Sequence, residues 1–415
     1  MAVLGVAGLQ VSNVSGQDAA KSWSVNGSLR GFYDSNSTAA ADEFAVESFG
    51  IGVEAGVGYN LPLDQTFFGA DYTYGLKWYE GRETGNTDQT HRFNLKLDHS
   101  FNEKYKVTLK DTFVATSEPT VLEQGGAITG RTLADAMLNR ANLDLAAQFT
   151  PKLGATIGYG NNWYDYDQEA GDVTNPQLFP SRSQLLDRME HLVPVEGRYT
   201  LKPETVVLAG YQYGMSDYQD DSPYFVGLPG AVGLQTPSWR NSQSHYLYGG
   251  VEHNFSPQLN AALRGGVQLQ DYTDLPTGAQ VEDSSTNPYV DANLSYLYNP
   301  GSYFLIGYRH SSTATDLTVL NAETDLVYLN WTHRITAQLN ASLTYQWQYS
   351  SFNQGYSGIY EDDKEMFNIF GLNLSYTISQ FLTGEIGYNY DDLDSDAPGR
   401  SYSRHVGYIG LRATY

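Results

Sequence analysis

Apolar and polar residues alternate along almost the whole chain. Between Leu339 and Tyr349, for example, the odd-numbered residues are apolar or aromatic and the even-numbered residues are Asn, Ser, Thr or Gln. A period of two residues is typical of a β-strand with one apolar face. Because no amphipathic helix is evident, the pattern predicts an all-β protein.

The alternation recurs in about eighteen segments separated by turn residues. These predicted strands are 22–34, 45–60, 65–78, 90–102, 105–116, 136–150, 153–165, 186–201, 204–217, 241–255, 258–272, 287–298, 302–313, 324–335, 338–352, 365–378, 381–392 and 402–415. Pro194 lies inside one of them and predicts a local irregularity, because proline cannot donate a ladder hydrogen bond.

The connections between these segments alternate in length. Short turns, such as Pro151-Lys152 and Lys202-Pro203, alternate with longer loops, of which 117–135, 166–184 and 219–240 are the longest. This alternation is typical of a transmembrane barrel. We therefore expect one closed antiparallel transmembrane β-barrel of about 18 strands (16–18) over residues 21–415, rather than two or three globular domains.

Residues 1–20 read differently from the rest of the chain. A short apolar stretch is followed by small and polar residues, and no basic residue precedes Lys21. The segment is therefore either a signal-peptide remnant or a flexible N-terminus.

The C-terminal residues suggest a family. Ile409, Leu411 and Ala413 alternate with other residues before the terminal Tyr415. The C-terminal octet, residues 408–415, resembles the signal by which the barrel-assembly machinery recognises outer-membrane proteins. The whole pattern resembles the putative β-barrel porin families of Gram-negative bacteria. The resemblance implies short periplasmic turns, long extracellular loops, and an outer membrane of lipid and lipopolysaccharide around the barrel. It also implies a water-filled channel for passive diffusion of small hydrophilic solutes.

In such a barrel the apolar register faces lipid and the polar register lines the pore. Phe93, Leu95 and Leu97 would then face lipid, and aromatic residues such as Trp23 and Tyr415 would form the interfacial girdles. The predicted pore-lining charges are twelve basic and eight acidic residues: Arg30, Lys77, Lys96, Lys106, Lys110, Arg140, Arg198, Arg264, Arg309, Arg334, Arg404, Arg412, Glu54, Asp71, Asp98, Asp144, Glu196, Glu252, Asp291 and Glu385. They could select solutes through their field, or they could bridge one another and stiffen the wall.

The net charge of −23 belongs mainly to the long loops under this assignment. It argues against a nucleic-acid partner, which requires clustered Lys and Arg. The loop carboxylates are expected to be solvated; binding of divalent cations that bridge lipopolysaccharide phosphates is the alternative. There is no cysteine, His245 and His253 are too far apart to share a metal, and we expect no metal site or cofactor.

No catalytic motif is present, and we do not expect an enzyme. Two alternatives to a general porin remain. Inward aromatic residues, namely Tyr246, Tyr248, Tyr328 and Tyr408, could stack on sugars in a substrate-selective channel. The loops could instead make a non-conducting surface adhesin or structural barrel. The sequence also leaves open whether the barrel is a monomer or a homotrimer.

Overall fold

The computed structural model describes residues 22–415, apart from residues 119, 121–125, 131–132, 174, 176, 178, 229–230, 280, 354–359 and 361. The predicted signal-peptide remnant or flexible segment, residues 1–20, lies outside the described residues.

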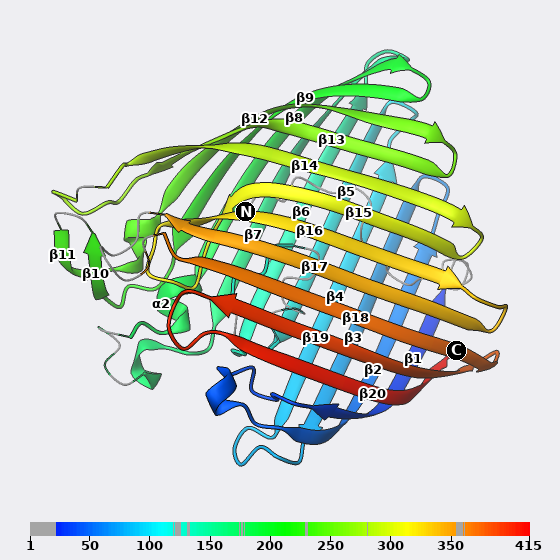
Figure 1. Cartoon of the computed structure of the whole chain (residues 1–415). Coiled ribbons are helices and arrows are strands. Elements are labelled where there is room, and N and C mark those ends of the chain that lie inside the picture. The colour runs from blue at the N-terminus through cyan, green and yellow to red at the C-terminus, as the bar shows by residue number, and fades with distance from the viewer. Residues whose placement is uncertain are drawn as a thin grey trace.

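Within the described residues, eighteen strands form one antiparallel sheet that closes on itself (Figure 1). Closure occurs where β1 pairs with β20 on one side and with β2 on the other. The strands of the barrel are β1 (Trp23–Asp34), β2 (Ser48–Pro62), β3 (Thr66–Tyr79), β4 (Thr87–Ser100), β5 (Tyr105–Thr116), β6 (Ala136–Gln148), β7 (Leu153–Tyr166), β8 (Arg188–Lys202), β9 (Thr205–Tyr218), β12 (Ser242–Ser256), β13 (Leu259–Tyr272), β14 (Ser284–Asn299), β15 (Ser302–Thr313), β16 (Asn321–Arg334), β17 (Leu339–Asn353), β18 (Lys364–Ser379), β19 (Leu382–Ser395) and β20 (Tyr402–Thr414).

The predicted fold is confirmed. Each predicted segment overlaps one strand of the barrel, and every strand pairs with its neighbours in antiparallel register. The period of two places one set of side chains on the outer face of each strand and the other set inside. On β20, for example, Ile409 and Leu411 on the outer face are 66% and 49% exposed, whereas Arg404 on the inner face is 4% exposed.

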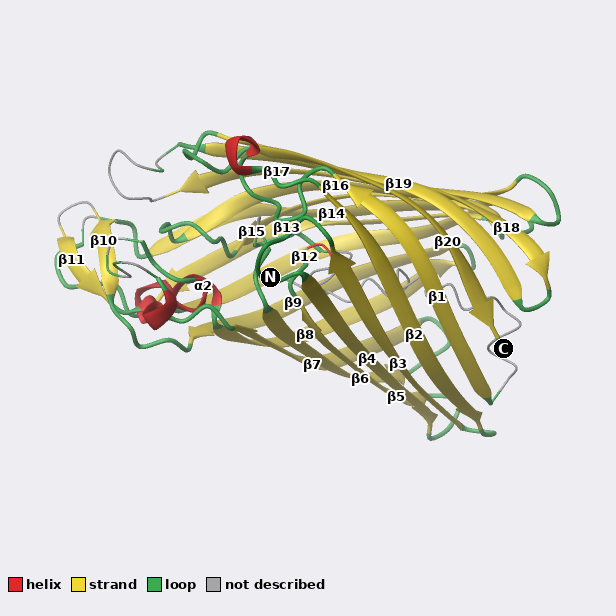
Figure 2. Cartoon of the chain, turned by 90° about the horizontal axis from the view of Figure 1, so that it is seen from below, coloured by secondary structure: helices red, strands yellow, loops and turns green. Residues whose placement is uncertain are grey.

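The two ends of the barrel differ (Figure 2). Short turns join β2 to β3 and β8 to β9 at one end, and the long loops lie at the other. The long loops carry the short elements of the described chain, which are η2 (Asp42–Phe44), η3 (Ala170–Asp172), α2 (Arg182–Leu186), the hairpin β10 (Tyr224–Leu228) and β11 (Ala231–Gln235), and η4 (Pro237–Arg240). None of the helices in the described residues is long and apolar enough to cross a membrane.

The irregularity predicted at Pro194 is present. The β7–β8 ladder pairs Ile157 with Val195 and resumes at Gly160 with Leu192, leaving out the positions between them. The ring of Pro194 approaches Gly158, where an added Cβ would lie 3.0 Å from the proline Cγ. The strand continues through the proline because the loss of pairing with β7 is confined to this short stretch of the ladder.

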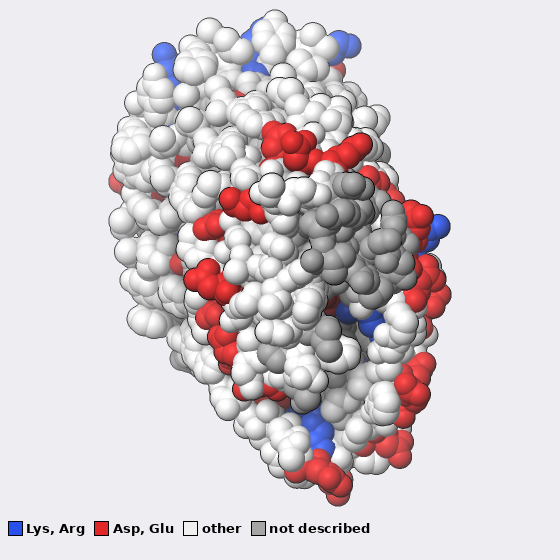
Figure 3. Space-filling view, turned by 90° about the vertical axis from the view of Figure 1, so that its left-hand side faces the viewer, with Lys and Arg blue, Asp and Glu red and all other residues white. Residues whose placement is uncertain are grey.

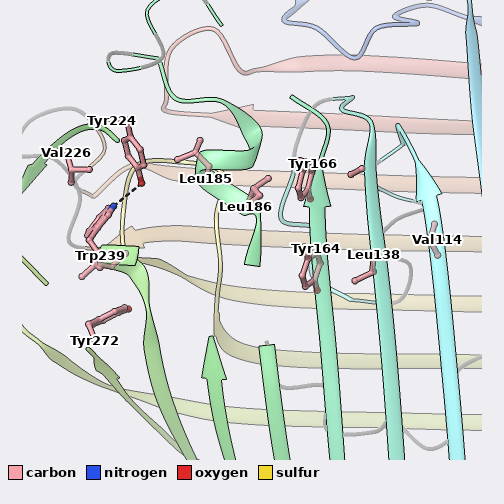
Figure 4. Packing of buried hydrophobic residues seen from close by; sticks show 12 residues of the cluster. Val114, Leu138, Tyr164, Tyr166, Leu185, Leu186, Tyr224, Val226, Trp239 and Tyr272 are labelled. Atoms are coloured by element: carbon pink, nitrogen blue, oxygen red, sulfur yellow. Dashed lines mark hydrogen bonds between the residues drawn. The ribbon is translucent and has the colours of Figure 1, made fainter. Parts of the chain in front are cut away.

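An apolar core lies inside the loop end of the barrel (Figure 4). Leu185 and Leu186 of α2 and Trp239 of η4 are buried together with Tyr164 of β7 and Tyr224 of β10. The indole Nε1 of Trp239 donates a hydrogen bond to the hydroxyl of Tyr224 at 2.9 Å. These segments of the long loops, α2, η4 and β10, are therefore packed into the mouth of the barrel.

Candidate channel

The inner face of the barrel carries most of the charged side chains of the strands. All twenty predicted pore-lining residues fall in the inner register of their strands. Arg334 is the most peripheral of them, since it ends β16 and its guanidinium donates to the carbonyl of Ala337 in a short turn. The placement brings most of these charges into contact, but it leaves their role in solute passage a prediction.

A polar cavity of about 1350 Å³ occupies the short-turn half of the barrel. Basic and acidic side chains from β4 to β14 line it, together with the turns between them. The charged lining residues are Lys96, Asp98, Glu103, Lys104, Lys106, Lys110, Asp144, Lys152, Glu196, Arg198, Glu252, Arg264 and Asp291. This volume could hold many water molecules, whose share of liquid volume is about 30 Å³ each.

One side of this cavity is neutralised by ion pairs. Arg198 contacts Glu196 of its own strand at 2.8 Å and Glu252 of β12. Arg264 of β13 contacts the same two carboxylates, with its Nη2 atom 3.1 Å from the Oε1 atom of Glu252. The hydroxyl of Tyr248 donates to Glu196 at 3.2 Å. The four charges therefore hold β8, β12 and β13 together and leave little net field.

Other wall charges are paired in the same way. Arg30 of β1 and Arg412 of β20 both contact Glu385 of β19, so this group spans the closure of the barrel. Arg309 of β15 contacts Asp291 of β14 at 2.9 Å. The salt-bridging interpretation of the wall charges thus describes these residues, because each cation has a carboxylate partner on an adjacent strand or on the next strand but one.

The lysines of β4 and β5 are balanced less completely. Lys96 and Lys106 share one carboxylate, Asp98, at 3.1 and 3.4 Å. Lys110 lies directly opposite Lys96 in the β4–β5 register. Among the described residues, Lys110 has no ion-pair partner within 4 Å. We call Lys96, Lys106 and Lys110 the lysine face of the cavity.

The inward tyrosines lie against glycines of the wall. The ring of Tyr328 covers Gly307, where an added Cβ would lie 2.1 Å from the tyrosine Cζ. Tyr248 covers Gly210 and Tyr408 covers Gly387 in the same manner. Tyr246 is 1% exposed and packs edge-on against Tyr289. The rings are thus used to fill the wall, which gives the predicted stacking on sugars no support.

The loop between β5 and β6 crosses the barrel. The side-chain amide of Gln348 on β17 accepts from the Ile128 amide at 2.8 Å and donates to the Ile128 carbonyl at 3.0 Å. Gln346 donates to the carbonyl of Gly126 at 3.3 Å. Because β17 lies across the ring of strands from β5 and β6, this loop narrows the barrel from wall to wall.

Glu118 anchors the start of that loop. Its carboxylate contacts Lys77 of β3 at 3.0 Å and Arg404 of β20 at 2.7 Å, and Arg404 also contacts Asp34 of β1. Burial alone would raise the pKa of Glu118, but the charges of Arg404 and Lys77 hold the pKa well below its usual range. The carboxylate is therefore charged at neutral pH and bridges β3 to β20.

A second network ties the remaining loops to the wall. Asp316 contacts Arg182 of α2 and Arg400 of the β19–β20 loop, each at 2.8 Å. Arg400 also contacts Glu365 of β18 at 2.7 Å. Three loops and one strand are thus joined through buried carboxylates, so the loop end is organised by ionic contacts as well as by its apolar core.

Comparison with known proteins identifies the class of protein. Residues 240–415 match a family model described as "Putative beta-barrel porin 2". Over these residues the chain is similar to outer-membrane β-barrel porins, and its location is the outer membrane. No curated protein matches this porin.

Among solved structures, the porin is similar to OccAB4 of Acinetobacter baumannii, with 14% identity, a TM-score of 0.44 and coverage of 95% of this chain and 99% of that chain. OccK5 (OpdH) of Pseudomonas aeruginosa gives 12% identity, a TM-score of 0.46 and coverage of 95% and 98%. A BenF-like porin from Pseudomonas fluorescens Pf-5 gives 10% identity, a TM-score of 0.46 and coverage of 95% and 99%.

The short-turn end of the porin is periplasmic and the loop end extracellular, as predicted. Figure 3 looks onto the loop end, where acidic side chains spread over the surface and fewer Lys and Arg atoms show. Asp42, Asp220, Asp362 and Asp396 belong to the loops of this end. In the described part of the chain, no three His, Asp or Glu side chains are grouped so that they could hold a metal ion.

Sequence reasoning missed several charged residues of the extracellular half. Asp34, Glu190 and Glu365 are buried and paired with arginines, and each could have been found by extending the inner register to the strand ends. Glu118 could not, because it lies in a loop and reaches the wall only through the loop's path. The four predicted assembly-signal residues lie on the outer face at the end of β20, where Tyr415 is 75% exposed.

Proposed function

We propose that the porin is a diffusion channel for small hydrophilic solutes. Its wide periplasmic vestibule is the polar cavity described above, and its extracellular end is narrowed by inward-folded loops. The charged cavity of about 1350 Å³ carries this proposal, because a closed barrel of this size is too wide for wall side chains alone to fill. The loop that reaches β17 supplies the narrowing.

The lysine face gives the vestibule a preference for anions within this proposal. Lys96 and Lys106 share one close carboxylate, and Lys110 has none within 4 Å among the described residues, whereas the arginines across the cavity are matched by Glu196 and Glu252. Rings and patches of charged side chains set the preference of a pore. A solute carboxylate or phosphate would therefore be attracted to the lysine side of the vestibule.

Reconstitution in a planar bilayer tests the channel and its preference together. The wild-type porin should give stable conductance steps, and replacing Lys96, Lys106 and Lys110 together by Gln should move the reversal potential toward cation selectivity in a salt gradient. Lys364→Gln is the matched control, because Lys364 lies at the exposed start of β18 outside the vestibule. Absence of any conductance would contradict the proposed channel function. An unchanged reversal potential in the triple variant would contradict the proposed anion preference of the lysine face.

We also propose that the porin has no catalytic role, and the positions of its histidines support this. The oxygen partners of their rings belong to tyrosines, threonines and one aspartate. A nucleophilic serine would need such a ring as its base. Recognition of Ile409, Leu411, Ala413 and Tyr415 by the barrel-assembly machinery, and assembly as a homotrimer, remain predictions.

A further inference from the structure

The histidines of the porin lie on its lipid-facing surface. All eight fall in the described residues, and each occupies the outer register of its strand. They form two groups at different heights. The extracellular group is His91, His191, His245, His310 and His405, and the periplasmic group is His99, His253 and His333. The separation of the two groups matches a membrane: His91 and His99 are eight residues apart on β4, which corresponds to a height of about 20 Å for a tilted strand.

One arrangement is repeated four times in the extracellular group. A tyrosine that lies deeper in the apolar band reaches up to the Nδ1 atom of a histidine on the adjacent strand, as Tyr72 does to His91 at 2.8 Å. The other three pairs are Tyr159 with His191 at 2.8 Å, Tyr211 with His245 at 2.8 Å, and Tyr388 with His405 at 2.6 Å. We call these four the outer tyrosine–histidine pairs.

The surroundings of the pairs are also alike. The residue directly opposite each histidine is the one two positions beyond the bonded tyrosine, such as Tyr74 opposite His91. Tyr213 and Tyr390 occupy this position beside His245 and His405, and Asn161 does so beside His191. The two rings of a pair lie at similar tilts, with centroids 6.0 to 6.2 Å apart. Such repetition around the barrel favours a common role over chance.

The hydrogen bond to Nδ1 determines what the other ring nitrogen can do. A tyrosine hydroxyl that donates to Nδ1 leaves the proton of a neutral imidazole on Nε2. No described residue forms a hydrogen bond with the Nε2 atom of His91, His191, His245 or His405. With the tyrosine hydroxyl as the donor to Nδ1, each pair offers an Nε2–H donor to the membrane surroundings, at the height where headgroups begin.

We propose that the outer tyrosine–histidine pairs bind phosphate groups of outer-leaflet lipid headgroups, with the histidine Nε2–H as donor. Phosphate oxygens are strong charged acceptors, and hydrogen bonds to them are among the strongest in proteins. The acidic loops above the outer tyrosine–histidine pairs cannot supply this contact, because their carboxylates repel phosphate. The proposal adds a lipid site to the porin and does not depend on what passes through its lumen.

Two sets of substitutions distinguish lipid binding by these histidines from a role in which each histidine only accepts the hydrogen bond of its tyrosine. The side-chain amide of Asn lies where Nδ1 lies in histidine, whereas the amide nitrogen of Gln lies near the position of Nε2. Replacing His91, His191, His245 and His405 together by Asn should keep a partner for the tyrosines but remove the donor to lipid. Replacing the same four residues by Gln should keep that donor.

The measurement is native mass spectrometry of the folded full-length porin titrated with bisphosphorylated lipid A. The fourfold Asn variant should bind this lipid about tenfold more weakly than wild type, the effect of losing a charge-assisted hydrogen bond. The fourfold Gln variant, and the control His99→Asn with His253→Asn and His333→Asn, should bind it as wild type does. Heat-modifiable migration on SDS gels checks that each variant is folded.

Three results would overturn the proposal. The first is wild-type lipid A binding by the folded Asn variant, which would leave the histidines as partners of tyrosine only. The second is equal binding of wild type to dephosphorylated lipid A, which would make the phosphate irrelevant. The third is displacement of the lipid by excess inorganic phosphate, which would identify a site for the free anion rather than the headgroup.

Discussion

Single residues of the wall are matched across neighbouring strands. Glycine and tyrosine form one such match, in which the missing Cβ of Gly307, Gly210 or Gly387 makes room for a ring that lies flat on the sheet. The ring restores the packing that glycine alone would forfeit. Inward aromatic residues therefore belong to the wall even though their register faces water.

Gly307→Ala tests this match. The new Cβ would lie 2.1 Å from Cζ of Tyr328, so the ring must leave the wall, and we expect the porin to lose about 1–3 kcal/mol of stability. Tyr328→Ala in the same background should recover part of that loss, because the clash is gone. Urea unfolding in detergent micelles would measure both. Losses that simply add would show that ring and glycine are independent.

A second residue-scale prediction concerns Asp111. This carboxylate lies in the lipid-facing register of β5 beside Leu95 of β4 and accepts a hydrogen bond from Asn139 at 2.9 Å. A charge in the apolar band is unfavourable, so Asp111→Leu should stabilise the isolated porin by about 1 kcal/mol. Unfolding in lipid vesicles measures this. If the substitution instead dissociates an oligomer, the face around Asp111 contacts another protein chain, which would bear on the predicted homotrimer.

At the scale of elements, the loops are held inside the barrel by specific contacts with distant strands. The loop after β5 is fixed at its start by Glu118 and near its middle by the amides of Gln346 and Gln348. A loop tethered at both points has fewer conformations than its length allows. Its contacts with β17 therefore determine how far the channel is narrowed.

Replacing Gln346 and Gln348 together by Ala should release that tether. Three hydrogen bonds to the loop backbone would be lost, and we expect larger and noisier single-channel conductance while the barrel stays folded. Gln338→Ala is the control, because Gln338 bonds Tyr376 in the outer register near a periplasmic turn. Conductance and noise equal to those of wild type would mean that the loop does not limit the pore.

The loop before β8 should respond to pH through Asp187. Burial raises the pKa of Asp187 to about 7, and nearby Asp165, Glu169 and Asp220 add to the effect, although the Tyr166 amide opposes it. The folded state therefore binds a proton more tightly than the unfolded state, and stability falls as pH rises from about 4 to 7. Asp187→Asn should raise the thermal unfolding temperature at pH 8 and change it little at pH 4. Equal effects at both pH values would rule out titration of Asp187 as the cause.

At the scale of the whole molecule, charge is divided between the wall and the loops. The net charge is −23, yet the wall cations described above are mostly paired and the vestibule carries a surplus of lysine on one side. Solutes therefore meet an acidic surface outside and a mildly basic cavity inside. The acidic outer surface attracts cations and the basic cavity attracts anions. Salt ions in the surrounding solvent can screen the field of the outer surface.

This division predicts a selectivity that depends on ionic strength. In about 0.1 M KCl the screening length is about 10 Å, so the acidic loops should attract cations to the mouth, whereas in about 1 M KCl it falls to about 3 Å. Reversal potentials at a fixed salt ratio should therefore shift toward anion preference as total salt increases. A shift in the opposite direction would place the controlling charges deeper in the barrel.

The alternation of residues by itself determined the strands, their number and the two faces of the wall, whereas the location in the outer membrane came from the resemblance to porin families. It could do so because, in a barrel, the face of every side chain follows from its position along the strand. The partner of each charge was decided by the tertiary structure: Glu385 joins Arg30 and Arg412 only because β19, β20 and β1 close the barrel. The path of the loop to Gln348 and the repeated pairs of Tyr72 with His91 likewise required the register between strands far apart in sequence. A period of two fixes which way a side chain points, whereas its contacts depend on pairing and loop packing, which the pattern does not encode.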